Sequence, residues 1–163
     1  MKTERLYYSD SYIKEFNALV ISCEKIEKGY KVVLNKTAFF PEGGGQQADT
    51  GFIGDAKVTD VQEAEDVIYH YVDKELTVAT EYSCKIDWEQ RFLRMQSHSG
   101  EHIVSGVVHS LYGYDNVGFH LGLQEVTLDF NGVLTLEQLR EIEAMANEAV
   151  WKNIPINIAF PSS

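Results

Sequence analysis

The stretch Arg94-Met-Gln-Ser-His-Ser-Gly-Glu-His-Ile-Val104 lies where the sequence changes from short strands to a long helix. Just upstream, Asp87-Trp-Glu-Gln90 is a variant of the capping box, in which an N-terminal Asp is followed three residues later by Gln. Apolar residues then recur at helical spacing, which predicts a helix over 89–112. His98 and His102 share one face of that helix, with Cβ atoms about 5–6 Å apart. Two imidazoles so placed can bind one metal ion.

The part of the chain before this helix has the pattern of strands. Five runs are rich in β-branched and aromatic residues: 18–23, 30–34, 56–61, 67–72 and 82–86. The first two are joined across Lys28-Gly29, which predicts a hairpin. Short strands at this spacing predict a small barrel or sandwich-like unit over about 1–86.

Residues 87–163 are predicted to form an α+β unit, so the fold class is α+β. A hairpin is expected around Gly122, from 117–121 and 125–130. Thr135-Leu-Glu-Gln138 is a second capping box and starts another helix, after which 156–160 has the character of a last strand. The boundary near 87 is a change of periodicity, without a low-complexity linker.

Composition narrows the function classes. The chain has 163 residues, 44% hydrophobic, and a net charge of −11 from 14 basic and 25 acidic residues. Because binding along a phosphate backbone depends on Lys and Arg, nonspecific binding of long nucleic acid is disfavoured, whereas a local contact with one nucleic-acid end is allowed. No apolar run approaches the roughly 20 residues that span a bilayer. Two cysteines, Cys23 and Cys84, give no disulfide framework, so a cytoplasmic protein is expected.

The segment Thr37-Ala-Phe-Phe-Pro-Glu-Gly-Gly-Gly-Gln46 is the second unusual motif. Gly43, Gly44 and Gly45 permit positive φ and a close backbone approach to another surface. No Lys-Ser/Thr follows the glycines, so a nucleotide-binding P-loop is excluded. A rigid glycine arch that presents Thr37 and Gln46 suits the recognition of a small polar substrate.

Glu101 makes the helix read His-x-x-Glu-His. This is the pattern of inverzincin metallopeptidases, in which the glutamate is a general base and another carboxylate completes the metal site. The acidic helix after Thr135 offers several carboxylates, none distinguished by spacing. The alternative for Glu101 is a solvated residue one step around the helix from His102.

Taken together, the motifs resemble the editing region of alanyl-tRNA synthetases, and still more the free-standing AlaX editing proteins. The segments that carry this resemblance run in the family's order over nearly the whole chain: 6–12, 37–46, 48–51, 86–88, 95–102, 118–122 and 126–130. It implies a β-barrel over 1–86 joined to an α+β editing domain over 87–163.

The implied activity is hydrolysis of the ester that joins a wrong amino acid, serine or glycine, to alanine tRNA. His98 and His102 occupy the first two positions of the family's zinc set, and Gln46 matches its glycine-loop glutamine. Thr37 matches a threonine that senses the serine hydroxyl, and Glu101 joins these two as a catalytic candidate. The cofactor expected is zinc, and the partner is the aminoacylated acceptor end of tRNA.

The resemblance stops short of the family's later Cys-x-x-x-His motif, because no Cys or His follows His120. The chain is therefore expected to be truncated, with impaired activity and zinc held by only two of four ligands. Apolar surface exposed by the lost segment would favour a homodimer. A module that binds tRNA ends or proteins without catalysis remains the third hypothesis, beside the editing hydrolase and the peptidase.

Overall fold

The computed structural model describes residues 2–122, 125–156 and 159. They fall into two compact units, Met1–Met95 and Gln96–Ser163. The elements are β1 (Glu4–Arg5), η1 (Leu6–Tyr8), β2 (Glu15–Lys25), β3 (Tyr30–Leu34), β4 (Lys36–Thr37), β5 (Gly51–Ile53), β6 (Ala56–Ala64), β7 (Val67–Val72), β8 (Glu81–Ile86), α1 (Trp88–Tyr112), β9 (Asn116–Leu121), β10 (Val126–Phe130) and α2 (Leu136–Trp151). The predicted α+β class is confirmed.

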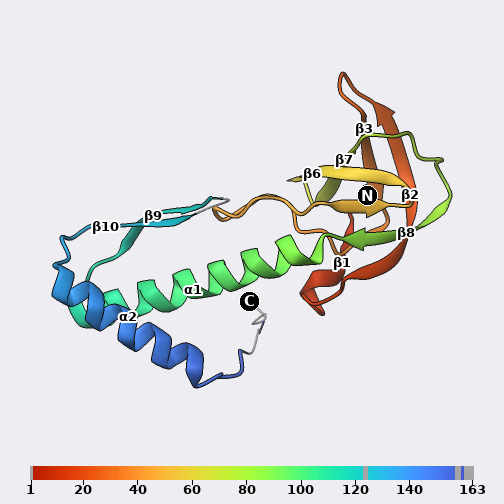
Figure 1. Ribbon diagram of the computed structural model, residues 1–163. Coiled ribbons are helices and arrows are strands. Elements are labelled where there is room, and N and C mark those ends of the chain that lie inside the picture. Colours follow the sequence, from red (N-terminus) through yellow and green to blue (C-terminus); the bar gives the residue numbers. More distant parts are fainter. Residues whose placement is uncertain (1, 123–124, 157–158, 160–163) are drawn as a thin grey trace. The chain divides into compact units, whose positions relative to one another are not determined.

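The first unit is built on a closed barrel with strand order β2-β3-β7-β6-β5-β8 (Figure 1). All the neighbours in it pair antiparallel, and β2 and β3 form the expected hairpin, with Cys23 opposite Val32. Closure removes the free sheet edges on which other chains could pair. The prediction of a small barrel is confirmed, and the sandwich alternative is wrong.

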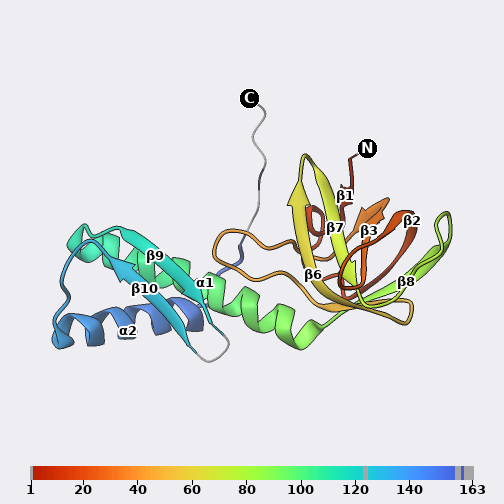
Figure 2. The ribbon, with the colours of Figure 1, turned by 90° about the horizontal axis from the view of Figure 1, so that it is seen from above.

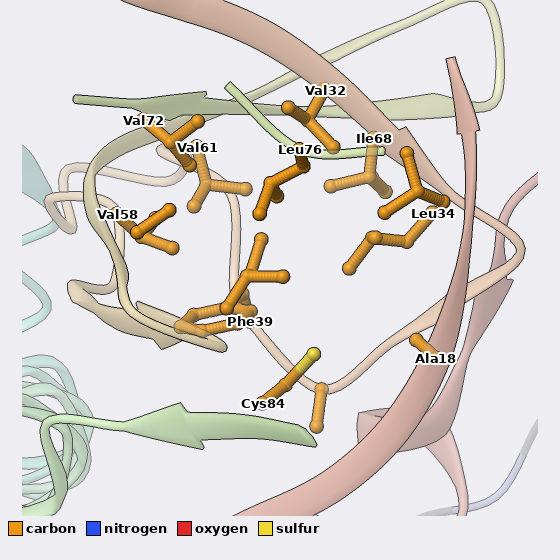
Figure 3. Packing of buried hydrophobic residues seen from close by; sticks show 14 of the residues in the cluster. Ala18, Val32, Leu34, Phe39, Val58, Val61, Ile68, Val72, Leu76 and Cys84 are labelled. Atoms are coloured by element: carbon orange, nitrogen blue, oxygen red, sulfur yellow. The ribbon is translucent and has the colours of Figure 1, made fainter. Parts of the chain in front are cut away.

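The barrel core follows from the alternation of side chains along each strand. In β7, Ile68, His70 and Val72 point inward and are buried, while the residues between them are half-buried. Valine, isoleucine and leucine side chains from facing strands fill the interior around Phe39 (Figure 3). Cys84 is buried among them as a small apolar side chain, and its burial raises the pKa of the thiol to about 12.

The helix α1 begins one residue earlier than predicted and spans both units. The Asp87 carboxylate accepts a bond from Gln90 N at 3.3 Å, but Asp87 N donates to Thr50 O, 2.8 Å away in the barrel. The N-terminal turns of α1 therefore belong to the barrel unit. The boundary between the units falls after Met95, whereas the sequence predicts it after residue 86. A change of periodicity marks where a helix starts, whereas the boundary depends on which residues its turns contact.

The second unit contains the rest of α1, the β9–β10 hairpin and α2 (Figure 2). The hairpin is antiparallel, and the Thr135 capping box forms in both directions at the start of α2, as predicted. Among the described residues of this unit, Val108, Leu121 and Ile142 are the buried apolar side chains. The strand expected at 156–160 lies largely outside the described residues. Among the described helices, none is long and apolar enough to cross a membrane.

Candidate functional site

His98, Glu101 and His102 form one cluster on α1, in the second unit. Their ligand atoms lie within 4.8 Å of one another. The two imidazole rings stack with centroids 5.1 Å apart and planes 21° from parallel, as expected for positions four apart on a helix. His98 is half-buried, whereas the His102 side chain is 73% exposed. The pairing inferred from the sequence is therefore present, with one imidazole open to solvent.

Glu101 is buried, which excludes the alternative of a solvated glutamate. Its Oε1 accepts bonds from Ser105 Oγ at 2.6 Å and from Asn116 Nδ2 at 2.8 Å. Asn116 Nδ2 also lies 3.0 Å from Ser105 Oγ, which closes a small polar network between α1 and the first residue of β9. The other oxygen, Oε2, is 3.2 Å from His102 Nδ1. A buried carboxylate is stable only with such partners.

The strand β9 contributes a second side chain to the cluster. The ring of Phe119 lies 5.4 Å from that of His98. His120, the next residue, is exposed, because successive side chains of a strand point to opposite faces. His109 Nδ1 pairs with Asp115 Oδ1 at 2.9 Å on the surface near the C-terminal end of α1. The cluster thus contains His98 and His102 of α1, but neither His109 nor His120.

In the first unit, the three glycines form a tight turn. Gly43 and Gln46 exchange two backbone hydrogen bonds, Gly43 N to Gln46 O at 3.1 Å and Gln46 N to Gly43 O at 3.0 Å. Gly44 and Gly45, the central residues, have φ of 58° and 77°. Two positive φ values in this position define a type I′ turn, which glycine adopts without strain. The arch expected from the sequence is this turn, and Gln46 closes it.

A buried ion pair holds the base of the glycine loop. Asp49 Oδ2 accepts from Phe40 N at 2.7 Å, and Asp49 N donates to Phe40 O, so the two ends of the loop are joined. Arg91 of α1 binds the same carboxylate, with Nε 2.8 Å from Oδ2, and both side chains are buried. Arg94 donates to Ala48 O at 2.7 Å. Two arginines of the first helical turns therefore anchor the loop.

Thr37 lies in the barrel interior and is fully buried. Its Oγ1 is 2.9 Å from His70 Nε2 and accepts a bond from Phe39 N at 3.1 Å. Burial lowers the pKa of His70 to about 4, so the imidazole is neutral near pH 7. Nδ1 lies 3.3 Å from Val32 O, the arrangement of a donated hydrogen, so Nε2 accepts from the Thr37 hydroxyl.

The candidate residues therefore divide between the two units. The structure brings His98, Glu101 and His102 together in the second unit, while Thr37 and the Gly43–Gln46 turn lie in the first. Sequence reasoning missed the network partners Ser105 and Asn116. Ser105, four residues after Glu101 on the same helix face, offered a signal, whereas the partnership with Asn116 depends on how β9 returns along α1.

The structure has a barrel that carries a glycine turn, followed by an α+β unit with two paired histidines. This architecture agrees with the editing domain that the sequence motifs resemble. A family model described as tRNA synthetases class II (A) matches residues 2–90. Two alanyl-tRNA editing proteins are similar: Aarsd1-A of Xenopus laevis, 38% identical over 91% of this chain and 39% of its own length, and AlaX-L of Pyrococcus horikoshii, 33% identical over 95% and 40%. The alanine–tRNA ligase of Ignicoccus hospitalis is 41% identical over 91% of this chain and 17% of its own length.

The chain belongs to the AlaX-type alanyl-tRNA editing family, which is related to the class II (A) tRNA synthetases. It spans about two fifths of the length of the editing proteins and less than a fifth of that of the ligase. The peptidase alternative receives no support from these relatives. It would also require Glu101 to be free to act as a base, yet both of its oxygens face other side chains.

Proposed function

We propose that this chain supplies the site for editing of mischarged alanine tRNA in the cytoplasm. The reaction is hydrolysis of the ester in Ser-tRNA(Ala), with Gly-tRNA(Ala) as a second substrate, and the partner is the aminoacylated acceptor end. The observation that carries the proposal is the cluster of His98, Glu101 and His102 within 4.8 Å. The names of the relatives, alanyl-tRNA editing proteins and alanine–tRNA ligase, supply the substrate class.

The chemistry of the cluster fits a zinc ion held by His98 and His102. Imidazole nitrogen is a common zinc ligand, and the two stacked rings come from one helix face. Histidine ligands usually present their second nitrogen to a carboxylate, as His102 Nδ1 does to Glu101. That contact leaves His102 Nε2 for the metal. When bound, zinc would polarise the ester carbonyl or lower the pKa of a water molecule.

Glu101 acts in this scheme as a positioning residue. Two donors fix its Oε1, so its Oε2 faces His102 in one orientation. These contacts favour holding the imidazole in place over the direct part in catalysis that the motif suggested. Glu101→Gln removes the charge beside Nδ1 but keeps the size, and should lower zinc affinity about 10- to 100-fold. Competition with a chromophoric chelator measures this without any tRNA.

The glycine turn and its neighbours are proposed to bind the aminoacyl group. Gly43, Gly44 and Gly45 place backbone groups where no side chain intervenes, and Gln46 closes the turn with amide groups able to donate and accept. Thr37 as the reader of the serine hydroxyl stays a prediction. Its own hydroxyl already bonds His70, so this role requires it to share or exchange that bond.

The need for a second site follows from the size of the substrates. A pocket for alanine cannot strongly reject glycine, which lacks one methyl group, or serine, which only adds a hydroxyl, because such differences are worth about 1–3 kcal/mol. A separate site that binds the hydroxyl and cleaves the ester can correct these errors. A homodimer of this chain also stays a prediction.

Deacylation of Ser-tRNA(Ala), Gly-tRNA(Ala) and Ala-tRNA(Ala) by the purified chain tests the proposal. We expect slow hydrolysis of the first two, in keeping with the impaired activity expected of a two-histidine zinc site, with loss of activity on chelation and recovery on addition of zinc. His98→Ala and His102→Ala should abolish it, while His109→Ala, on the same helix but outside the cluster, should not. Hydrolysis that survives loss of both His98 and His102 would rule out the metal role. Cleavage of an unstructured peptide instead of the esters would rule out editing.

A further inference from the structure

A basic and aromatic row crosses the outer face of the barrel. Phe52 of β5 pairs in register with Lys57 of β6 on one side and with Lys85 of β8 on the other. All three are exposed, while the residues that flank each of them along its strand are buried. Neighbouring strands lie about 4.8 Å apart, so the two lysine positions are about 10 Å apart with the ring between them. We call this the Lys57–Phe52–Lys85 row.

The row lines a hollow in the barrel surface. Its volume is about 290 Å³, and Phe52 is 47% exposed within it. The remaining lining comes from residues next to Phe52 and Lys85 in sequence: Thr50, Gly51, Ile86 and Asp87. This volume is at the lower end of the range for ligand sites, which suits one flat ring better than a large ligand.

The charge of the row differs from that of the chain. The chain carries a net charge of −11, yet both strand neighbours of Phe52 are lysines. Lys85 Nζ lies 3.4 Å from Glu15 Oε1, with both side chains well exposed. Such an exposed pair contributes little to stability, so a phosphate can compete for the lysine. The Asp87 carboxylate is engaged with Gln90 N at the start of α1.

More aromatic side chains follow next to the hollow. Trp88, which follows Asp87 in sequence, stacks on Phe92 with centroids 5.7 Å apart and lies 5.7 Å from Tyr12. Lys14 Nζ is 4.7 Å from the centre of the Trp88 ring. Tyr12 is 58% and Phe92 37% exposed. The combination of exposed aromatic rings and lysines therefore continues beyond the row, within the same unit.

We propose that the Lys57–Phe52–Lys85 row binds a single-stranded segment of the RNA substrate, an inference that rests on tRNA being that substrate. One base stacks on Phe52, and the phosphates on either side of it contact Lys57 and Lys85. Aromatic rings flanked by cations are the general means of holding single-stranded RNA without reading its sequence. Two lysines beside an aromatic ring in an acidic chain favour a polyanion with flat bases over an apolar protein surface.

Binding of a fluorescently labelled eight-nucleotide single-stranded RNA, followed by anisotropy over a series of salt concentrations, tests the row. Phe52→Ala should weaken binding about 5- to 150-fold, the range found for loss of one stacked base. Phe52→Leu keeps apolar area but no aromatic face and should also weaken it. Lys57→Gln with Lys85→Gln should reduce the slope of log affinity against log salt by about 1.4.

Matched controls use lysines of the barrel outside the row. Lys31→Gln with Lys74→Gln removes the same charge from two residues that pair with Glu24 and Asp55, and should leave the salt slope steeper than the row variant does. Circular dichroism checks that each variant folds. We expect all of them to fold, because the mutated side chains are exposed. Equal affinity and slope for the row variant and this control would overturn the proposal.

Two further outcomes separate the row from the catalytic proposal. RNA binding that depends on the row, in a chain that fails to hydrolyse any ester, would support the row and refute the editing activity. Ester hydrolysis with row variants that bind RNA as the wild type does would refute the row alone. If the variants instead change only self-association in light scattering, a second copy is the partner and the RNA proposal is wrong.

Discussion

Acidification from pH 7.5 to pH 5 should destabilise the barrel through one buried imidazole. His70 is fully buried, and burial lowers its pKa from 6.5 to about 4. The unfolded chain takes up a proton near pH 6.5, whereas the folded chain resists it until about pH 4. The stability that this residue contributes is therefore complete above pH 6.5 and is lost progressively as the pH falls towards 4.

The size of the effect follows from the same two values. At pH 5 the unfolded imidazole is almost fully protonated and the folded one mostly neutral, which lowers the free energy of unfolding by about 2 kcal/mol relative to pH 7.5. Below pH 4 the loss reaches its limit of about 3 kcal/mol. Since a whole domain is stable by only about 5–15 kcal/mol, this is measurable.

Urea denaturation at a series of pH values measures it, with Trp88 fluorescence as the probe in a Trp151→Phe background. Trp88 lies in the barrel unit and Trp151 in the other, so the signal then reports the barrel. His70→Gln can keep bonds to Thr37 and Val32 but cannot titrate, and should flatten the pH dependence by about 2 kcal/mol at pH 5. His109→Gln, an exposed histidine, should not. Parallel curves for the wild type and His70→Gln would refute the reasoning.

Three other perturbations test the loop and the cluster. His98→Ala should leave the unfolding midpoint nearly unchanged but abolish zinc binding, measured by competition with a chromophoric chelator, and a large loss of stability would mean that the imidazole is structural. Gly44→Val should destabilise the type I′ turn by about 1–2 kcal/mol, because a β-branched residue is strained at φ of 58°. Gly43→Ala is the control, because a Cβ atom added at Gly43 has no neighbouring atom within 4 Å. Asp49→Asn should lower stability by about 3–5 kcal/mol in urea denaturation, because it leaves the buried Arg91 charge unpaired; a loss below 1 kcal/mol would contradict the anchoring role.

Five of the six barrel strands, α1 and the β9–β10 hairpin could be predicted because their signals are local, whereas the three-residue strand β5 was not predicted. Alternation of period two and apolar residues at helical spacing depend only on neighbours in the chain. The same is true of the histidine pair, since a helix brings positions four apart to one face. The motif order over the whole chain also sufficed to recognise the family, which the relatives then confirmed.

Only the tertiary structure decided what surrounds the polar residues. Glu101 is a buried carboxylate that Asn116, from another element, reaches with a hydrogen bond. The Thr37 hydroxyl is engaged because the fold places His70, which is 33 residues further along the chain, 2.9 Å from it. The Arg91–Asp49 pair likewise joins residues separated by 42 positions. The free energy of a buried polar group depends on the partner that replaces water. That partner is brought by the return path of the chain, which no local pattern of residues encodes.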